Sequence, residues 1–300
     1  MPALILDGKE VSRQILAALK PRVAALDPKL AVVLVGDNAE SESYVKQKIK
    51  SCDLVGMRHE IKRLPASLTL PALLGEIDGL NADPDVSGFI VQLPLPAHLQ
   101  EHVPQVIRAI DPAKDVDGFT AYNLGKMFLS REFEHLPPAT PGGVTDLLDH
   151  YGLSVAGKHA VVIGRSNIAG KPLAIMLLNR GATVTVCHKG TPDIAAFTRM
   201  ADMLVTAAGV PGLVTADMVQ GGVVVIDIGL TRTEGGLKGD VDFEGVKRKA
   251  TAITPVPGGV GPMTVARLIK NCVIAKERQR ETDARNSLHE QSHPERSRRA

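Results

Sequence analysis

The sequence is poor in aromatic side chains, since its 300 residues include no Trp, 3 Tyr and 6 Phe. A hydrophobic core in this chain must therefore be built from aliphatic residues, which suits the layers of helix and sheet of an α/β protein. The length predicts one large domain or two of medium size.

Cysteine is also scarce: Cys52, Cys187 and Cys272 stand far apart in the chain. Three widely spaced thiols provide neither a disulfide framework nor the close ligand spacing of a zinc site. We therefore expect no metal site. A reducing compartment, the cytoplasm, is the simplest setting for such a protein.

The body of the chain has no surplus of either charge. Residues 276–300 hold seven Lys/Arg and five Asp/Glu, which leaves 28 of each in residues 1–275. A neutral body argues against a nucleic-acid partner. The segment 277–300 is polar and has little apolar periodicity, so we expect it to be a disordered tail.

Long apolar runs are missing as well. The first residues, MPALILDGKE, lack the basic region and long apolar run of a signal peptide. No other stretch is long and apolar enough to span a bilayer, so we expect no membrane partner.

One stretch combines a strand, a glycine turn and a helix. His159 to Ile163 has the β-branched composition of a buried parallel strand, and Gly164 ends it. Gly170 then opens an apolar-periodic helix that stops at Gly181. Such a unit can hold a phosphate, because glycine lets the backbone approach and the helix N-terminus supplies free N–H groups. The spacing matches neither G-x-G-x-x-G nor a Walker A loop, so an ordinary turn of a doubly wound sheet is the alternative.

The next strand, 182–187, bears on the choice of nucleotide. It ends in His188-Lys189-Gly190, without the carboxylate that holds the ribose 2′-OH of NAD. Lys189 and Arg165 instead offer positive charge to a 2′-phosphate, and Ser166 also suits phosphate binding. The sequence therefore favours NADP over NAD, with a solvated loop lysine as the alternative for Lys189.

A second candidate site lies on a helix expected at 39–55. At about 100° per residue, Lys48 falls inside the apolar arc one turn after Tyr44, whereas Lys46 and Lys50 fall on the far side. A partly desolvated lysine has a lowered pKa and can transfer protons near neutrality, and Tyr44 offers a flat face to a ring. The alternative is a lysine at the edge of the stripe that extends its stem to reach solvent.

Two further polar groups follow in the chain. Gln92 ends a strand expected at 86–92, at the carboxyl end where open α/β sheets place ligands. Asp117 lies in the loop 111–119, where a carboxylate can grip an N–C–NH₂ edge with two hydrogen bonds. The alternatives are a glutamine that caps loop backbone and a simple Asp-Gly turn.

Proline and glycine at 137–143 mark the clearest break in the chain. A helix is expected at 144–151. Strand–helix alternation from 158 to 254 then predicts a doubly wound parallel sheet. A loop rich in proline and glycine, 254–262, precedes a last helix that begins at Pro262.

Taken in order, these motifs resemble those of the bifunctional methylenetetrahydrofolate dehydrogenase/methenyltetrahydrofolate cyclohydrolase family, the bacterial FolD type. The resemblance runs from about residue 3 to residue 275. It rests on Tyr44-Val-Lys-Gln-Lys48, Gln92-Leu-Pro-Leu-Pro96, Lys114-Asp-Val-Asp-Gly-Phe119, Thr140-Pro-Gly-Gly143, Gly164-Arg-Ser-Asn-Ile-Ala-Gly-Lys-Pro172 and Thr254-Pro-Val-Pro-Gly-Gly-Val-Gly-Pro-Met-Thr264.

The resemblance implies two αβα domains around a cleft, the second with a Rossmann-type doubly wound parallel sheet. The catalytic, folate-binding domain would span 1–138 and be completed by a C-terminal helix at 262–276. The NADP-binding domain would span 139–261. The resemblance also implies NADP as cofactor, a folate as substrate and a homodimer.

Site residues follow from the resemblance motif by motif. Lys48 is the catalytic lysine, Gln92 positions it, Tyr44 stacks on the folate ring system and Asp117 holds the pterin edge. Further folate contacts are implied at Leu93, Pro257, Gly258 and Gly259, and NADP contacts at Gly164, Arg165, Ser166, Ile168, Lys189 and Leu230. Three positions depart from commoner versions, namely Ala139, Lys189 and Thr231, and of these Lys189 leaves the cofactor preference slightly open.

The implied function is oxidation of 5,10-methylenetetrahydrofolate with NADP, followed by hydrolysis of the methenyl product to 10-formyltetrahydrofolate. A neutral Lys48 would take the proton of the attacking water. Three alternatives stand beside this hypothesis: a dehydrogenase without useful cyclohydrolase activity, a catalytically silent NADP- or folate-binding protein, and another NADP-linked dehydrogenase such as one for a hydroxy acid.

Overall fold

The computed structural model describes residues 2–292 of the chain, with side chains through residue 285. The chain forms two compact units. Unit 1 comprises Met1–Ala18 and Ala121–Leu268, and unit 2 comprises Leu19–Thr120 together with the chain from Ile269 onward. Residues 121–138 group here with the second half of the chain, although the sequence places them in the first domain.

Unit 1 is built on a six-stranded sheet in the order β1-β11-β8-β7-β5-β6, and every neighbouring pair is parallel. The strands are β1 (Leu4–Ile5), β5 (His159–Ile163), β6 (Thr183–Cys187), β7 (Met203–Thr206), β8 (Val224–Asp227) and β11 (Ala252–Ile253). A separate antiparallel pair is formed by β9 (Thr231–Thr233) and β10 (Gly236–Lys238). This arrangement confirms the predicted α/β class with a doubly wound parallel sheet.

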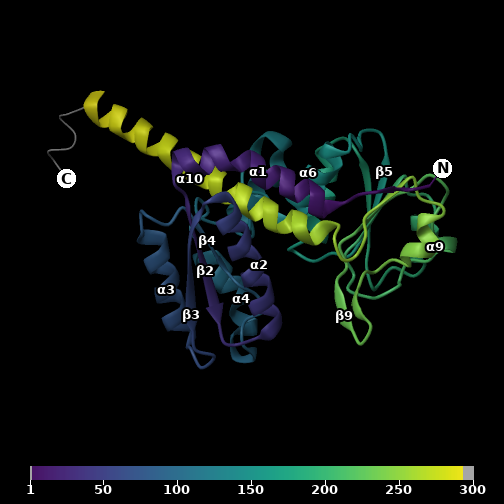
Figure 1. Cartoon of the computed structure of the whole chain (residues 1–300), viewed down its shortest axis with the longest axis horizontal. Coiled ribbons are helices and arrows are strands. Elements are labelled where there is room, and N and C mark those ends of the chain that lie inside the picture. The colour runs from purple at the N-terminus through teal and green to yellow at the C-terminus, as the bar shows by residue number, and fades with distance from the viewer. Residues whose placement is uncertain (1, 293–300) are drawn as a thin grey trace. The chain divides into compact units, whose positions relative to one another are not determined.

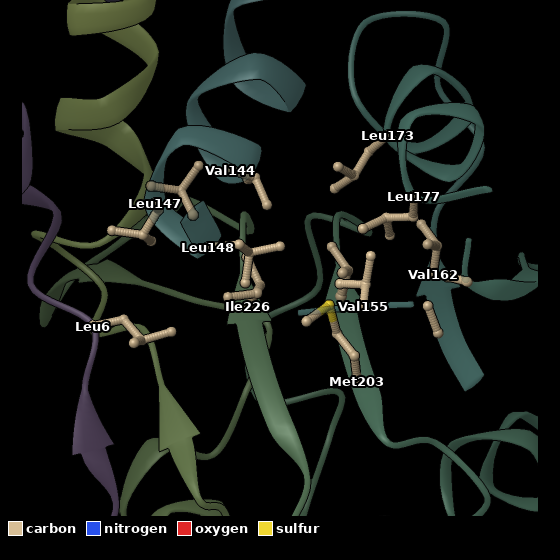
Figure 2. Close-up of a cluster of buried hydrophobic side chains, with 14 of the residues drawn as sticks. Leu6, Val144, Leu147, Leu148, Val155, Val162, Leu173, Leu177, Met203 and Ile226 are labelled. Atoms are coloured by element: carbon tan, nitrogen blue, oxygen red, sulfur yellow. The ribbon is translucent and has the colours of Figure 1, made fainter. Parts of the chain in front are cut away.

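Helices cover both faces of this sheet because its central strands are apolar on both sides. Figure 2 shows Leu148 of α6 (Ala139–His150) beside Ile226 of the sheet, and Leu147 belongs to the same buried cluster. Leu173 and Leu177 of α7 (Gly170–Leu178) join the same cluster. The opposite face packs against α8 (Ile194–Thr198) and α9 (Phe243–Lys247) in a second cluster. Three further helices lie wholly within this unit, namely α5 (Ala121–Leu129), η2 (Arg131–Phe133) and η3 (Ala216–Met218).

Helix α6 begins earlier than the sequence predicts. The break was expected to last through Gly143, yet Ala139 already starts the helix. Pro141 is tolerated because the first turn of a helix has no partner for the N–H group that proline lacks. Ala139, Pro141, Gly142 and Gly143 are all buried, so tertiary packing overrides their low helix propensity.

Unit 2 contains a parallel sheet in the order β3-β2-β4. Its strands are β2 (Lys29–Val35), β3 (Arg58–Leu64) and β4 (Gly88–Val91), and its helices are α2 (Ala39–Val55), α3 (Leu70–Ala82), η1 (Ala97–His102) and α4 (Val103–Ala109). Figure 1 shows α3 alongside this sheet. Apolar residues of α3 and α4 bury one sheet face together with Val33 and Phe89. Because the three strands are parallel, their carboxyl ends lie at the same edge of the sheet.

The division between the units falls within α1 (Gly8–Leu26) and α10 (Val260–Ser292). Helix α10 begins before the predicted Pro262. Among the residues that the structure describes, no helix is both long enough and apolar enough to cross a membrane.

The chain is helical, not disordered, from 277 to Ser292. Glu277 is paired with Arg22 at 2.6 Å, and Gln279 Nε2 donates to the carbonyl oxygen of Ser87 at 2.8 Å. The segment is also rich in Lys, Arg, Glu and Gln, which are good helix formers. Charge and polarity predicted disorder because they do not reveal these contacts. Residues 293–300 of the expected tail lie outside the described residues.

Candidate active site

Helix α2 carries Lys48 on a partly buried face. Asn38 caps the helix, its Oδ1 accepting a hydrogen bond from the N–H of Ser41 at 2.9 Å. Lys48 is half-buried, whereas Lys46 and Lys50 are exposed. The helical periodicity predicts this difference between the three lysines.

Gln92 holds the lysine side chain. Lys48 Nζ donates to Gln92 Oε1 at 2.9 Å. The amide nitrogen of the same side chain, Nε2, donates to the carbonyl oxygen of Leu93 at 2.7 Å. This second bond orients the amide so that its oxygen faces the lysine. Gln92 directly follows β4, so the sheet edge fixes its backbone while α2 supplies the lysine.

The loop that carries Asp117 is built by its neighbour Asp115. Asp115 is buried, and its carboxylate accepts hydrogen bonds from the N–H groups of Gly118 at 2.9 Å and Thr120 at 2.8 Å. Lys114 anchors the same loop, because its Nζ donates to the carbonyl oxygens of residues 80 and 83 at the end of α3. The sequence motif singles out Asp117 alone and neither of these two supports. The signal available was an Asp three residues before a glycine, which favours a side-chain-to-backbone turn.

Burial disfavours the charged form of both ionisable groups of this site, Lys48 and Asp117. It lowers the pKa of Lys48, and the charge of Asp117 opposes that shift. Burial raises the pKa of Asp117. The charge of Lys48 opposes this rise, and the charge of Asp115 adds to it. A lysine whose charged form is disfavoured can exchange a proton nearer neutral pH than a solvated lysine can.

Two more groups of α2 lie near Lys48 along the helix. Tyr44 lies one turn before Lys48 and is 39% exposed, so its ring is available to a ligand. Ser41 lies two turns before Lys48 and is buried. Its hydroxyl has no hydrogen-bond partner among the described residues, although buried hydroxyls normally have one. No motif in the sequence singles out Ser41.

In unit 1 the turn after β5 forms a close cradle. Gly164 has φ of +122°, and a Cβ on it would lie 2.4 Å from the carbonyl oxygen of Ala207. A Cβ on Gly170 would lie 2.1 Å from the carbonyl oxygen of Gly164. Ser166 Oγ closes the turn by accepting from the N–H of Ala169 at 3.2 Å. The turn lies where β5 is flanked by β6 and β7, the topological switch point at which such sheets bind ligands.

Two cations extend from neighbouring strand ends beside this turn. Ile163 and Cys187 are register partners of β5 and β6, and Gly164 N–H donates to Cys187 O at 2.8 Å. Arg165 and Lys189 each follow two residues later, and both are exposed. The two charges therefore belong to adjacent positions of one sheet edge.

The segment 254–262, whose last three residues already belong to α10, also lies in unit 1. Gly258 O accepts from the N–H of Lys9 at 3.1 Å, and Gly259 N–H donates to Pro255 O at 2.8 Å. The structure thus brings Lys48, Gln92 and Asp117 together in unit 2. Pro257, Gly258 and Gly259 lie in unit 1, and their contact with a folate stays a prediction.

Comparison with known proteins identifies both parts of the chain. Residues 6–117 match the family model "Tetrahydrofolate dehydrogenase/cyclohydrolase, catalytic domain", and residues 138–280 match the NAD(P)-binding domain of the same family. The chain belongs to the tetrahydrofolate dehydrogenase/cyclohydrolase family.

Relatives match this family member over nearly its whole length. The "Bifunctional protein FolD" of Acidovorax sp. (strain JS42) is 50% identical over 285 residues, covering 93% of this chain and 100% of that protein. The crystal structure of the FolD enzyme of Campylobacter jejuni is 45% identical with a TM-score of 0.88, covering 92% of this chain and 99% of that one. The Trypanosoma brucei enzyme, solved with NADP and an inhibitor, is 38% identical with a TM-score of 0.88, covering 93% and 99%.

The NAD(P)-binding part of this family member fits its nucleotide. The turn at Gly164 leaves no room for a side chain, so backbone N–H groups can approach a phosphate. Arg165 and Lys189 are exposed cations that follow the adjacent strands β5 and β6. Ile168 and Leu230 are apolar and exposed, as contacts to flat rings require. The described residues contain no group of three or more His, Cys, Asp or Glu that could hold a metal ion.

Proposed function

We propose that this enzyme carries out two successive reactions on a folate. It oxidises 5,10-methylenetetrahydrofolate with NADP and hydrolyses the resulting 5,10-methenyltetrahydrofolate to 10-formyltetrahydrofolate. NADP, when bound, supplies the acceptor for the hydride. The observation that supports the hydrolytic step most directly is the partly buried Lys48, held by a neutral amide in the catalytic domain.

Lys48 acts as the proton-transfer group of the hydrolysis. Burial lowers its pKa, so a neutral amine is available to take a proton from the attacking water. The positive charge of the methenyl substrate disfavours the ammonium form further, because like charges repel. Gln92 Oε1 holds Nζ without adding a negative charge that would favour the ammonium. Lys48 then returns the proton to the ring nitrogen that leaves.

Other residues of unit 2 bind and orient the substrate. The carboxyl group of Asp117 takes the N–C–NH₂ edge of the pterin through two hydrogen bonds. The exposed ring of Tyr44 stacks on the folate ring system, and Leu93 contributes apolar contact. Pro257, Gly258 and Gly259 border the folate from their own loop. The unit 2 residues hold the reacting carbon in place, which is the main contribution of a protein to a cofactor-driven redox step.

Unit 1 residues bind the nucleotide. The backbone at Gly164 and the side chain of Ser166 contact a phosphate, while Arg165 and Lys189 pair with the 2′-phosphate that distinguishes NADP from NAD. Ile168 and Leu230 pack against the apolar faces of the cofactor.

The experiment that tests the hydrolytic role supplies 5,10-methenyltetrahydrofolate without NADP to the purified chain and to Lys48→Met. Loss of hydrolysis in the variant alone supports it. Equal hydrolysis by both proteins contradicts it.

We infer further that a second copy of the chain covers an apolar face of unit 1. On this face Phe128 of α5 is 66% exposed, and Val186 of β6 is also exposed. A groove of about 360 Å³ lies on it, lined by residues of α5, α7 and β6 that include Phe128 and Val186. Because β6 is an edge strand, its outer backbone groups are open to pairing. A homodimer would cover both features.

Light scattering tests the homodimer. The expected mass is twice that of the 31.9 kDa chain, and Phe128→Glu should shift it toward the mass of one chain. A mass of one chain for the unaltered protein would contradict the proposal.

The cytoplasm is the setting that we infer for this enzyme. Cys52, Cys187 and Cys272 are all free and buried, and burial raises the pKa of the Cys52 thiol to about 12. Free thiols are the rule in a reducing compartment. Fractionation of the source cells, with the dehydrogenase assayed in each fraction, would test the assignment.

A further inference from the structure

Two buried carboxylates lie together at the carboxyl edge of the unit 1 sheet, outside every motif discussed above. Asp227 ends β8 and is 3% exposed, and Asp240 follows β10 and is fully buried. Buried charges cost free energy unless hydrogen bonds replace the lost water. The partners of these two groups therefore indicate what they do.

Asp227 collects four donors from separate parts of the chain. Its Oδ1 accepts from Thr206 Oγ1 at 2.9 Å, from Gly229 N at 2.9 Å and from Asp240 N at 3.1 Å. Its Oδ2 accepts from Val241 N at 3.0 Å. One carboxylate thus joins the end of β7, the loop after β8 and the segment after β10.

Asp240 binds three consecutive N–H groups of the loop after β7. Ala208 and Gly209 donate to its Oδ2 at 2.7 and 3.2 Å, and Val210 donates to its Oδ1 at 2.8 Å. The loop is therefore clamped along its whole first turn by a single side chain. Because every partner is a donor, an ionised carboxylate satisfies this site and an amide of the same shape does not.

Glycines allow the carboxylates to come so close to the backbone. A Cβ on Gly229 would lie 2.2 Å from the Asp240 carboxyl carbon, and one on Gly239 would lie 2.0 Å from Asp227 Oδ2. The clamped loop in turn reaches the phosphate turn, since Ala207 O occupies the space that a Cβ on Gly164 would need.

We propose that Asp227 and Asp240 are positioning residues for NADP, which hold the loops 207–210 and 228–231 in one arrangement beside the phosphate turn. The exposed apolar side chains of Val210 and Leu230 stand on these loops, where they can pack on the cofactor. The proposal rests on the cofactor contacts that we propose at Gly164 and Leu230.

A purely stabilising role explains the pair less well. Burial, with the charge of Asp240 added to it, raises the pKa of Asp227 to about 6, so the two anions oppose one another. Buried charges can often be replaced by packed apolar residues without loss of stability. The presence of both Asp227 and Asp240 at the edge of the sheet beside the phosphate turn is better explained by the loop geometry that the two carboxylates impose.

The test compares Asp240→Asn and Asp227→Asn with Asp217→Asn, an exposed aspartate of the same unit. Three quantities are measured: the Kd for NADP by calorimetry, the amide hydrogen exchange of residues 208–210, and hydrolysis of 5,10-methenyltetrahydrofolate without NADP. We expect the first two variants to weaken NADP binding by about tenfold or more, a difference of about 1.4 kcal/mol. Exchange at 208–210 should quicken, while hydrolysis stays within about twofold because it does not use NADP. Asp217→Asn should change none of the three.

Unchanged NADP affinity in folded Asp240→Asn would overturn the proposal. Equal losses of NADP binding and of hydrolysis would also overturn it, because they indicate general unfolding. If the asparagine variants do not fold, Thr206→Val removes one donor to Asp227 and should raise the Kd for NADP by about threefold, with an unchanged Kd as the contrary result. Failure of the unaltered protein to bind NADP would instead refute the proposed function.

Discussion

Lys48 Nζ donates a hydrogen bond of 2.9 Å to Gln92 Oε1, while Gln92 Nε2 donates to the backbone at Leu93. The amide thereby orients the lysine and contributes no formal charge. A carboxylate in its place would hold the lysine equally well but would favour the ammonium form. This pairing explains how a lysine can be fixed in position and still be available as a base.

Replacing Lys48 by methionine removes the amine and keeps most of the apolar stem. We expect hydrolysis of 5,10-methenyltetrahydrofolate to fall by about 10²-fold or more, the usual scale of general acid–base catalysis. The measurement is the decay of the methenyl chromophore at fixed enzyme concentration. NADP affinity should be unchanged, because Lys48 is not among the proposed nucleotide contacts.

Lys50→Met is the matched control for this variant. Lys50 lies on the same helix but is exposed, so its loss should leave hydrolysis within about twofold of the unaltered enzyme. Undiminished hydrolysis by Lys48→Met would refute the proposed base.

Gln92→Glu should change the pH dependence of hydrolysis. A carboxylate beside Lys48 favours the ammonium and raises its pKa, so a higher pH is needed to produce the neutral base. We expect the acidic limb of the pH–rate profile to move upward by about 1 unit or more, and the rate at neutral pH to fall. A profile that stays where it is would show that the ionisation of Lys48 does not control the step.

Lys189→Ala and Arg165→Ala should discriminate between the two nucleotides. Each removes a charge-assisted contact to the 2′-phosphate, for which we expect a rise of about tenfold in KM for NADP and little change for NAD. Lys158→Ala serves as control, because Lys158 is exposed and precedes β5 at the opposite edge of the sheet. Equal effects on NADP and NAD would contradict the assignment.

The extended C-terminal helix makes a prediction about stability. Glu277→Ala breaks the ion pair with Arg22. Because the side chains of Glu277 and Arg22 are 32% and 41% exposed, the free energy of unfolding should fall by at most about 1 kcal/mol. Thermal unfolding should show a fall of at most about 2 °C in Tm. Glu281→Ala, one turn further on and exposed, should cost less than about 0.5 kcal/mol. Equal Tm values for the two variants would show that the pair contributes nothing.

Patterns of short range were enough to predict the parallel sheet and the orientation of Lys48. The β-branched run before Gly164 and the 3.6-residue period around Lys48 are properties of neighbouring residues. Both are borne out by the structure, in β5 and in the exposure of the three α2 lysines.

Features that depend on distant partners could not be predicted in this way. Helix α6 includes Pro141 because packing buries its first turn, and α10 continues beyond residue 276 because Glu277 meets Arg22. The roles of Asp115 and Asp240 depend on which N–H groups the fold brings to them. For Asp115 the only local signal is the glycine three residues later, and nothing near Asp240 in the sequence distinguishes it from a solvated aspartate.

The most direct test of two reactions on one chain is a single assay. Purified protein receives 5,10-methylenetetrahydrofolate and NADP, and the formation of NADPH and the methenyl chromophore are followed together. We predict that NADPH forms while the methenyl intermediate stays low, because hydrolysis removes it. Accumulation of the methenyl intermediate would contradict the second activity, and absence of reduced nucleotide with either NADP or NAD would contradict the first.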